Sequence, residues 1–315
     1  MTYQFRALAD QAMADGAITA EEILSLRRAG WGDGRIEPGE ADAIFTLNDH
    51  LAERTPEWVD FFVEALVEFV LAGGNPRGFV SEAQADWLIA HIDADGRVDT
   101  MAELELLARL LEKAELAPER LKSYALGQLE TIVLTGTGPT RDGGQCDGAR
   151  ITATECKLLR RCIFAMAGDG NGGVSQAEAE LLFRIKDATL GADNAPDWQT
   201  LFVQGVANHL MAWNGYKPVL ADEAIALESF MNDTTPRVGG FFGRMAKAEL
   251  GKGVSAVLGS GRKGVTAAAH NTAVAGANKV TEVEDAWLQA KIDADGSLDP
   301  LEKALLRFIA EEERA

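Results

Sequence analysis

The chain has 315 residues and a formal net charge of −19, with a sequence pI near 4.6. This length accommodates two ordinary domains or one duplicated domain, each with its own core, so size alone demands neither disulfides nor metals. The acidic balance excludes nucleic-acid binding through a basic face. It favours cations and basic partners instead.

Two further features of the composition bear on location. The three cysteines, Cys146, Cys156 and Cys162, lack CxxC spacing, which is typical of reduced thiols rather than a disulfide framework. The first residues, MTYQFRALADQAMADG, lack the basic and apolar regions of a secretory signal, and no apolar run approaches the length of a membrane span. The sequence therefore predicts an unexported, cytoplasmic protein.

The first forty residues contain two turns that carry the same helix-start signals. A helix over residues 1–14 is predicted to end at Gly16, since glycine suits the left-handed C′ position. Thr19 and Glu22 then form a predicted capping box. The stretch GDGRIEPGEA at 32–41 repeats the pattern, with Glu40 three residues after Glu37 and a proline at the first helical position.

The apolar residues of the stretch 58–70 recur at spacings of three and four, which predicts one buried face of a helix. The pattern returns 140 residues later, at 198–210, and both copies follow a proline and an acid. A match of this length indicates internal duplication. His209 takes the place of Phe69, so we predict a core-facing histidine rather than a ligand or a catalyst.

A second repeated stretch is DWLIAHIDADGRVDTMAE at 86–103, which returns as DAWLQAKIDADGSLDPLE at 285–302. Each copy predicts an apolar helix, an acidic turn and a second helix. No part of the chain alternates as a strand would, so we predict an all-α fold of two tandem helical-bundle repeats, each with three short acidic helix–turn–helix elements. The predicted boundaries are 1–134 for the first repeat, 135–148 for the connector and 149–315 for the second repeat.

Residues 233–280, inside the second repeat, form a basic, glycine-rich insertion. They hold seven Lys or Arg residues against two acids, about +5, which leaves about −24 on the remainder. One interpretation is a surface excursion attracted to the acidic body. The other is a docking segment for a protein or membrane partner, because apolar residues accompany the charge. Its GSGRKG string lacks the Gly-Lys-Ser/Thr order of a phosphate-binding loop, so nucleotide binding is excluded.

Three of the turns follow the spacing of a calcium-binding loop. An EF-hand loop places ligands at positions 1, 3, 5, 7, 9 and 12, with glycine at position 6. The candidate metal ligands are Asp93, Asp95, Asp99 and Glu103; Asp293, Asp295, Asp299 and Glu302; and Asp169, Asn171, Ser175 and Glu178. Glu103 lies one place later than position 12, and the others fall on the spacing. All three turns lack the leading aspartate. Their oxygen ligands favour Ca²⁺ over Zn²⁺, and the incomplete set predicts weak binding, on the order of 10⁻⁴ M.

The IDADG and GDGNGGVSQAE elements resemble degenerate EF-hand loops. AMADGAITAEEI, with its run of acidic turns between short helices, resembles the tellurite-resistance TerB-like helical domain. Members of that family carry similar A-x-A-D-G-x-I-x-x-x-E turns. The resemblance covers about a quarter of the chain. It implies a helical fold, divalent-metal binding and assembly with other proteins.

Two functions remain open at this point. Concentrating carboxylates in one turn is unfavourable unless a cation or solvent offsets the repulsion, which favours a non-enzymatic Ca²⁺-binding protein. Alternatively, the same turns are only helix caps, and the protein is a metal-free scaffold whose basic insertion docks a partner. We expect no enzyme activity, because these acids are predicted to lie at exposed helix ends where their pKa values stay low. No small-molecule substrate is indicated.

Overall fold

The computed structural model describes residues 3–30, 35–93, 98–141, 148–165, 167, 173–212, 282–292 and 298–312. Within these ranges lie twelve α-helices and one isolated β-bridge, but no strand, which confirms the predicted all-α class. The helices are α1 (Tyr3–Asp15), α2 (Ala20–Gly30), α3 (Pro38–His50), α4 (Pro56–Ala72), α5 (Glu82–Ile92), α6 (Met101–Lys113), α7 (Glu119–Thr135), α8 (Ala153–Ile163), α9 (Gln176–Ala188), α10 (Trp198–Ala212), α15 (Glu282–Ile292) and α16 (Pro300–Glu312).

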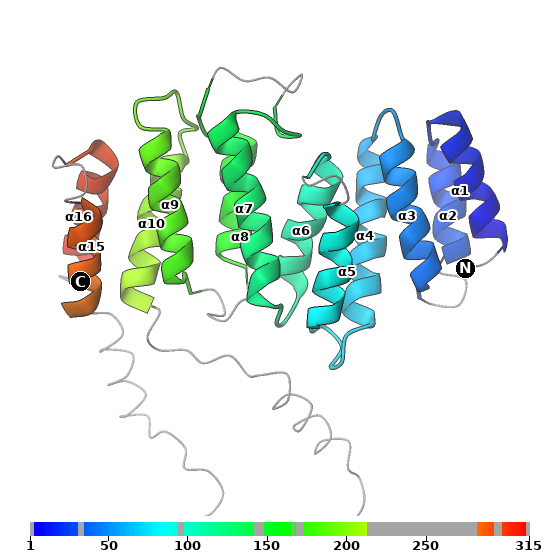
Figure 1. The fold of residues 1–315 in the computed structure, drawn as a ribbon, viewed down its shortest axis with the longest axis horizontal. Coiled ribbons are helices and arrows are strands. Elements are labelled where there is room, and N and C mark those ends of the chain that lie inside the picture. The colour runs from blue at the N-terminus through cyan, green and yellow to red at the C-terminus, as the bar shows by residue number, and fades with distance from the viewer. Residues whose placement is uncertain are drawn as a thin grey trace, which may run out of the picture.

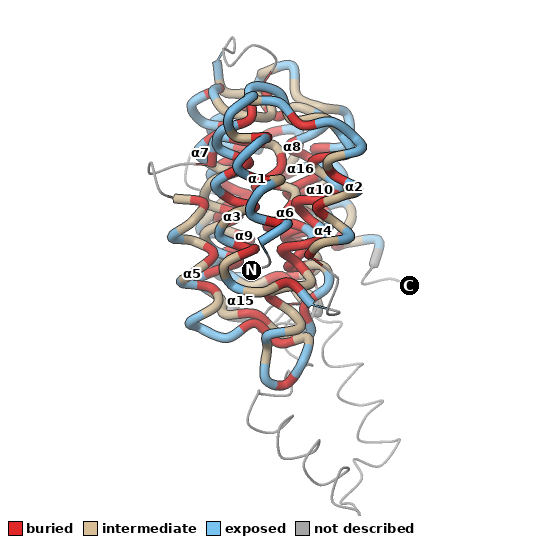
Figure 2. The backbone as a smooth tube through the Cα atoms, turned by 90° about the vertical axis from the view of Figure 1, so that its right-hand side faces the viewer, coloured by how far each residue is buried: buried red, intermediate tan, exposed pale blue. Residues whose placement is uncertain are grey.

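The helices form one elongated row, with the N-terminal helices at one end and the C-terminal helices at the other (Figure 1). Seen along the row, the odd-numbered helices make one layer and the even-numbered helices a second (Figure 2). Within each layer, neighbouring helices pack side by side, as α5 does with α7 and α6 with α8. The row is therefore continuous, and the arrangement as two tandem repeats with a connector at 135–148 stays a prediction.

The predicted helix-start signals are present in the structure. Gly16, at φ 63°, follows α1 and occupies the left-handed region that favours glycine. Glu22 accepts hydrogen bonds from the backbone and hydroxyl of Thr19, each 2.8 Å long. Reciprocal capping boxes begin α3, α5, α6, α8 and α9. Because these bonds satisfy orphan N–H groups, each box fixes where a helix starts.

The core lies between the two layers, where buried residues face one another (Figure 2). The predicted apolar face of α4 is buried, with Trp58, Phe61 and Phe62 fully covered. His209 is buried, and its Nδ1 lies 3.0 Å from the carbonyl oxygen of Val174. The predicted core-facing role of this histidine is confirmed.

Two aromatic clusters in different parts of the row share one geometry. The Phe45 and Phe62 rings in α3 and α4 meet edge-on at 5.3 Å, and Phe183 and Phe202 in α9 and α10 meet edge-on at 5.2 Å. Four further ring pairs match between the clusters: Phe45 with Trp87 at 5.6 Å, Phe183 with Trp287 at 5.7 Å, Phe69 with Trp87 at 5.1 Å, and His209 with Trp287 at 5.1 Å. The helices α3 to α5 thus pack with the same side-chain register as α9, α10 and α15.

The predicted insertion at 233–280 lies outside the described residues. The helices on either side of it are close, because His209 near the end of α10 contacts Trp287 in the middle of α15. Across the part of the chain that the structure covers, no helix combines the length and the apolar character needed to cross a membrane.

Candidate site at the acidic turns

The structure describes the flanks of the three candidate metal turns rather than their centres. Seven predicted ligands are described: Asp93, Asp99, Glu103, Ser175, Glu178, Asp299 and Glu302. Five lie outside the described residues: Asp95, Asp169, Asn171, Asp293 and Asp295. Within the described ranges, no three His, Cys, Asp or Glu side chains are grouped so that they could hold a metal ion.

The described carboxylates at the ends of these turns hold the starts of helices. Glu103 Oε2 accepts from the backbone N–H groups of Asp99 and Thr100, at 3.1 and 3.0 Å, where α6 begins. Glu178 accepts from the N–H of Ser175 at 2.8 Å, where α9 begins. These bonds satisfy donors that every helix leaves unpaired in its first turn.

At the start of α16 the cap is made by two carboxylates. Asp299 Oδ1 accepts from the N–H of Leu301 at 2.7 Å and of Glu302 at 2.9 Å. Glu302 Oε2 returns the bond by accepting from the N–H of Asp299 at 3.0 Å. Both side chains are therefore turned inward, toward the first turn of their own helix.

The prediction that these acids lie at exposed helix ends is wrong. Glu103 is 4% exposed, Glu178 is 3% exposed and Glu302 is 1% exposed, and Asp299 is also buried. Packing against other helices explains the difference, because the same capping bonds leave Glu22 partly exposed at the start of α2. By contrast, Asn48 of α3 covers Glu103, Lys122 of α7 covers Glu178 and Lys186 of α9 covers Glu302. A buried carboxylate needs hydrogen bonds and a compensating charge, or it takes up a proton.

The cation that compensates Asp299 and Glu302 comes from α9. Lys186 Nζ lies 2.6 Å from Asp299 Oδ2 and 2.6 Å from Glu302 Oε1, and its side chain is buried with them. Burial lowers the pKa of Lys186, but hydrogen bonds to Asp187, Asp299 and Glu302 outweigh burial and hold that pKa above its usual range. An ammonium group thus occupies the space between the two carboxylates.

Buried cations neutralise two other capping glutamates. Lys122 in α7 pairs with Glu178, and its ammonium also donates to the carbonyl of Ile163 at 3.1 Å. Arg141, in the loop before α8, pairs with Glu155 at 2.8 Å, where that helix begins. The sequence-based predictions missed all these partners.

A signal for the two lysine partners was available in the sequence. Lys186 follows the buried Phe183 by three residues and Leu182 by four, and so it lies on the apolar face of α9. Lys122 holds the equivalent position before Ala125 and Leu126 in α7. A lysine at such a position is buried only when a carboxylate pairs with it.

Glu103 has a neutral partner in place of a lysine. The side-chain amide of Asn48 in α3 donates to Glu103 Oε1 at 3.3 Å, and its oxygen Oδ1 accepts from the indole N–H of Trp58 at 3.2 Å. Asn48 precedes Lys186 by the same 138 residues that separate Phe45 from Phe183. The matching position in the two stretches is therefore an amide in α3 and an ammonium in α9.

Arg54 donates to the side-chain and backbone oxygens of Asn48, and Glu103 forms no ion pair with any Lys or Arg among the described residues. Burial, together with the nearby charge of Asp49, raises the pKa of Glu103 from 4.5 to about 7. The hydrogen bonds from Thr100 and Asp99 act in the opposite direction, but they do not offset the burial. Glu103 therefore changes its charge near neutral pH, which the sequence-based analysis did not predict.

A polar cavity of about 280 Å³ adjoins Glu103. It is lined by Asp49, Arg54, His91, Ile92, Asp99, Thr100 and Glu103. Asp93, the remaining described ligand of this turn, accepts a hydrogen bond from the Tyr124 hydroxyl at 3.3 Å. The cavity has room for water molecules, and Asp49, Asp99 and Glu103 supply oxygen atoms to its wall.

The chain matches no protein-family model, no curated protein and no solved structure. The resemblance to TerB-like domains and EF-hand loops consequently rests on the turn motifs alone and stays a prediction.

Proposed function

We propose that the protein is a non-enzymatic helical scaffold that docks a partner, and that most of its acidic turns are structural. One observation carries this proposal: the capping carboxylates of α9 and α16 are neutralised by Lys122 and Lys186 from within the chain. A cation bound at either place would have to displace a buried ammonium. The continuous two-layer row supports the proposal, because such arrays offer long surfaces for binding.

The segment at 233–280 is the proposed docking element. It carries about +5 on a chain whose remainder carries about −24, and it combines that charge with aromatic and aliphatic residues. This chemistry suits an anionic membrane surface or an acidic protein. We also propose that the matched aromatic clusters and helix caps come from internal duplication, which would make this segment an addition to one copy.

Co-sedimentation with lipid vesicles tests the docking proposal. The whole protein should bind vesicles that contain phosphatidylserine, and not vesicles of phosphatidylcholine alone. Binding should weaken as salt rises, because screening reduces attraction between surface charges. A chain in which 233–280 is replaced by a short Gly/Ser linker should not bind. Equal binding by both chains would contradict a docking role for this segment.

A second candidate function is weak binding of Ca²⁺ at the first acidic turn, through Asp93, Asp95, Asp99 and Glu103. The observation in its favour is the cavity beside Glu103, where a buried carboxyl with a pKa of about 7 meets an amide instead of a lysine. A bound cation would supply the missing positive charge. Because the cation competes with a proton, affinity should rise as pH increases through 7, and calorimetry at pH 6 and pH 8 tests that dependence.

A further inference from the structure

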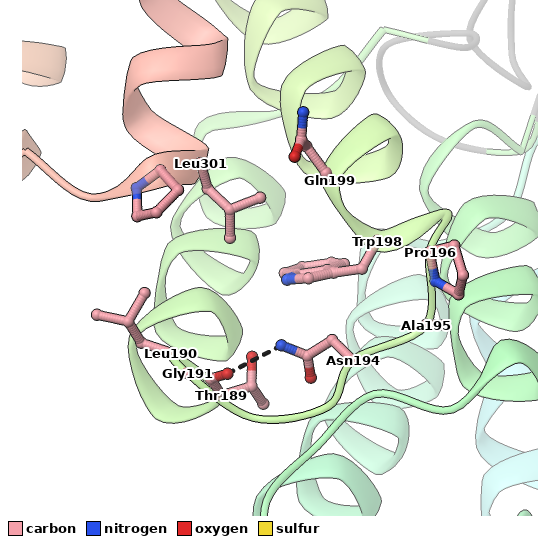
Figure 3. Close-up of a pocket in the computed structure, with 10 residues that line it drawn as sticks. Thr189, Leu190, Gly191, Asn194, Ala195, Pro196, Trp198, Gln199 and Leu301 are labelled. Atoms are coloured by element: carbon pink, nitrogen blue, oxygen red, sulfur yellow. Dashed lines mark hydrogen bonds between the residues drawn. The ribbon is translucent and has the colours of Figure 1, made fainter.

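A second cavity, of about 270 Å³, lies where α9 ends and where α10 and α16 begin (Figure 3). Ten residues line it: Thr189, Leu190, Gly191, Asn194, Ala195, Pro196, Trp198, Gln199, Pro300 and Leu301. None of them is charged, although a quarter of the chain is Asp, Glu, Lys or Arg. This lining favours a neutral ligand with a largely apolar body.

The indole N–H of Trp198 is the polar group that this cavity leaves unsatisfied. Trp198 is 2% exposed, and its Nε1 has no hydrogen-bond partner among the described residues. Figure 3 shows the nitrogen-bearing edge of the indole facing the space between Leu190 and Leu301. A buried donor without a partner costs free energy, so an acceptor in this cavity would be bound favourably.

Comparison with Trp58 explains why this donor has no partner. The indole N–H of Trp58 donates to Asn48 at 3.2 Å. At the position that matches Asn48, α9 carries Lys186, which has three donors and no acceptor. The substitution that neutralises Asp299 and Glu302 thus removes the internal acceptor for Trp198.

Of the other polar side chains in the cavity wall, Gln199 is exposed, while Thr189 and Asn194 are engaged in hydrogen bonds within the protein. The Thr189 hydroxyl donates to the carbonyl of Ile185 at 2.8 Å. The Asn194 amide donates to the carbonyl of Thr189 at 2.9 Å, and its oxygen accepts from the N–H of Ile151 at 2.9 Å. Thr189 and Asn194 are therefore preorganised, and the Trp198 indole is the buried donor that is left to select the ligand.

We propose that this cavity binds a small neutral molecule with an apolar body and one carbonyl oxygen, which accepts the hydrogen bond from Trp198. The volume corresponds to about nine water molecules, which suits a compact ring compound. The first turns of α10 and α16 border the cavity and add a favourable field for a partly negative oxygen. Leu190, Leu301 and the two prolines provide the apolar walls.

Nuclear magnetic resonance of the six indole N–H groups tests this proposal on the whole protein. Acetophenone is the probe, and α-methylstyrene is its isosteric control without the carbonyl oxygen. The indole signals of Trp198 and Trp58 are assigned with Trp198→Phe and Trp58→Phe. At equal millimolar concentrations, acetophenone should shift the Trp198 signal downfield, while α-methylstyrene should not, and the Trp58 signal should stay in place.

Variants of the cavity sharpen the test. Trp198→Phe keeps the ring but removes the donor, and should weaken acetophenone binding at least tenfold. Leu190→Ala alters the wall at a side chain that is 50% exposed, and should weaken binding a few-fold without unfolding the protein. Leu24→Ala, at a side chain that is 51% exposed and lies outside the cavity, should leave acetophenone binding unchanged. An unmoved Trp198 signal, or an equal shift with α-methylstyrene, would overturn the proposal.

Discussion

The starts of α6 and α16 each bury a capping glutamate, but the side chain that partners the glutamate differs. Each helix begins with an acid that reaches back to its own N-cap and is buried there, Glu103 in α6 and Glu302 in α16. Lys186 lies against Glu302, whereas Asn48 lies against Glu103. One site is a closed ion pair, and the other is a carboxyl group that titrates near neutral pH.

The difference shows that one substitution within a shared packing pattern changes what a buried acid can do. A buried ion pair fixes the charge state, since removing either partner leaves the other unpaired. An acid beside an amide keeps its capping bonds and can still exchange a proton or accept a cation. The same difference explains the Trp198 cavity, because Asn48 offers an acceptor to Trp58 and Lys186 offers none to Trp198.

The largest expected effect comes from opening the closed site. Lys186→Met leaves Asp299 and Glu302 buried without a cation, and should lower the free energy of unfolding by about 3–5 kcal/mol at pH 7. Urea unfolding followed by circular dichroism measures the change. Arg184→Met, on the same helix, removes the half-exposed pair with Glu130 and should cost less than about 1 kcal/mol. Similar losses in both variants would contradict the closed-site interpretation.

The second prediction concerns the pH dependence of Glu103. Between pH 4.5 and about 7, the unfolded chain has lost this proton while the folded chain keeps it, so stability falls as pH rises. Glu103→Gln keeps an N3 cap like that of Gln84 and removes this dependence. The free energy of unfolding of Glu103→Gln should equal that of the wild type near pH 4 and exceed it by about 3 kcal/mol at pH 8. Parallel stability curves for the two proteins would refute the raised pKa.

The third prediction converts the open site into the closed one. Asn48→Lys places a cation beside Glu103 and should bring the pKa of Glu103 below 4.5, as a carbon-13 titration of its carboxyl would show. The change also removes an acceptor from Trp58, at a cost of about 1–2 kcal/mol. Asn48→Leu, without the charge, should leave the pKa raised. A pKa that stays near 7 in the lysine variant would show that the two sites are not equivalent.

The smallest expected effect is that of removing the long connection between α10 and α15. The corresponding connection from α4 to α5 spans residues 73–81, and the contact of His209 with Trp287 at 5.1 Å brings the two helices together. Replacing residues 213–281 by a nine-residue Gly/Ser linker should change the free energy of unfolding by about 1 kcal/mol or less. Thermal unfolding measures it, and a much lower melting temperature would mean that this segment contributes to the core.

Local structure was predictable from the sequence because its causes are local. The box of Thr19 with Glu22, the proline that opens α3 and the glycine after α1 each act within four residues. The apolar face of α4 follows from spacing alone. The continuous two-layer row depends on how whole helices pack, and the spacing pattern does not encode that arrangement.

The burial of the acids was not predictable in the same way. Lys186 is 113 residues from Asp299 and 116 from Glu302 along the chain. The sequence motif that makes the helix cap is the same whether its glutamate faces water, an amide or a lysine. Only the packing of α9 against α16 and of α3 against α6 separates a closed site from a titrating one.

The most direct test of this distinction is a calorimetric titration of metal-stripped protein with Ca²⁺ at pH 8, with Mg²⁺ as the control. We predict that calcium uptake, at no more than one weak site, disappears in Glu103→Gln and Asn48→Lys. It should persist in Asp293→Ala and Glu302→Gln, because Lys186 closes that turn without a metal. Calcium binding that is lost in Glu302→Gln but survives in Glu103→Gln would contradict the claim that the turn at Glu302 is closed and the turn at Glu103 is open.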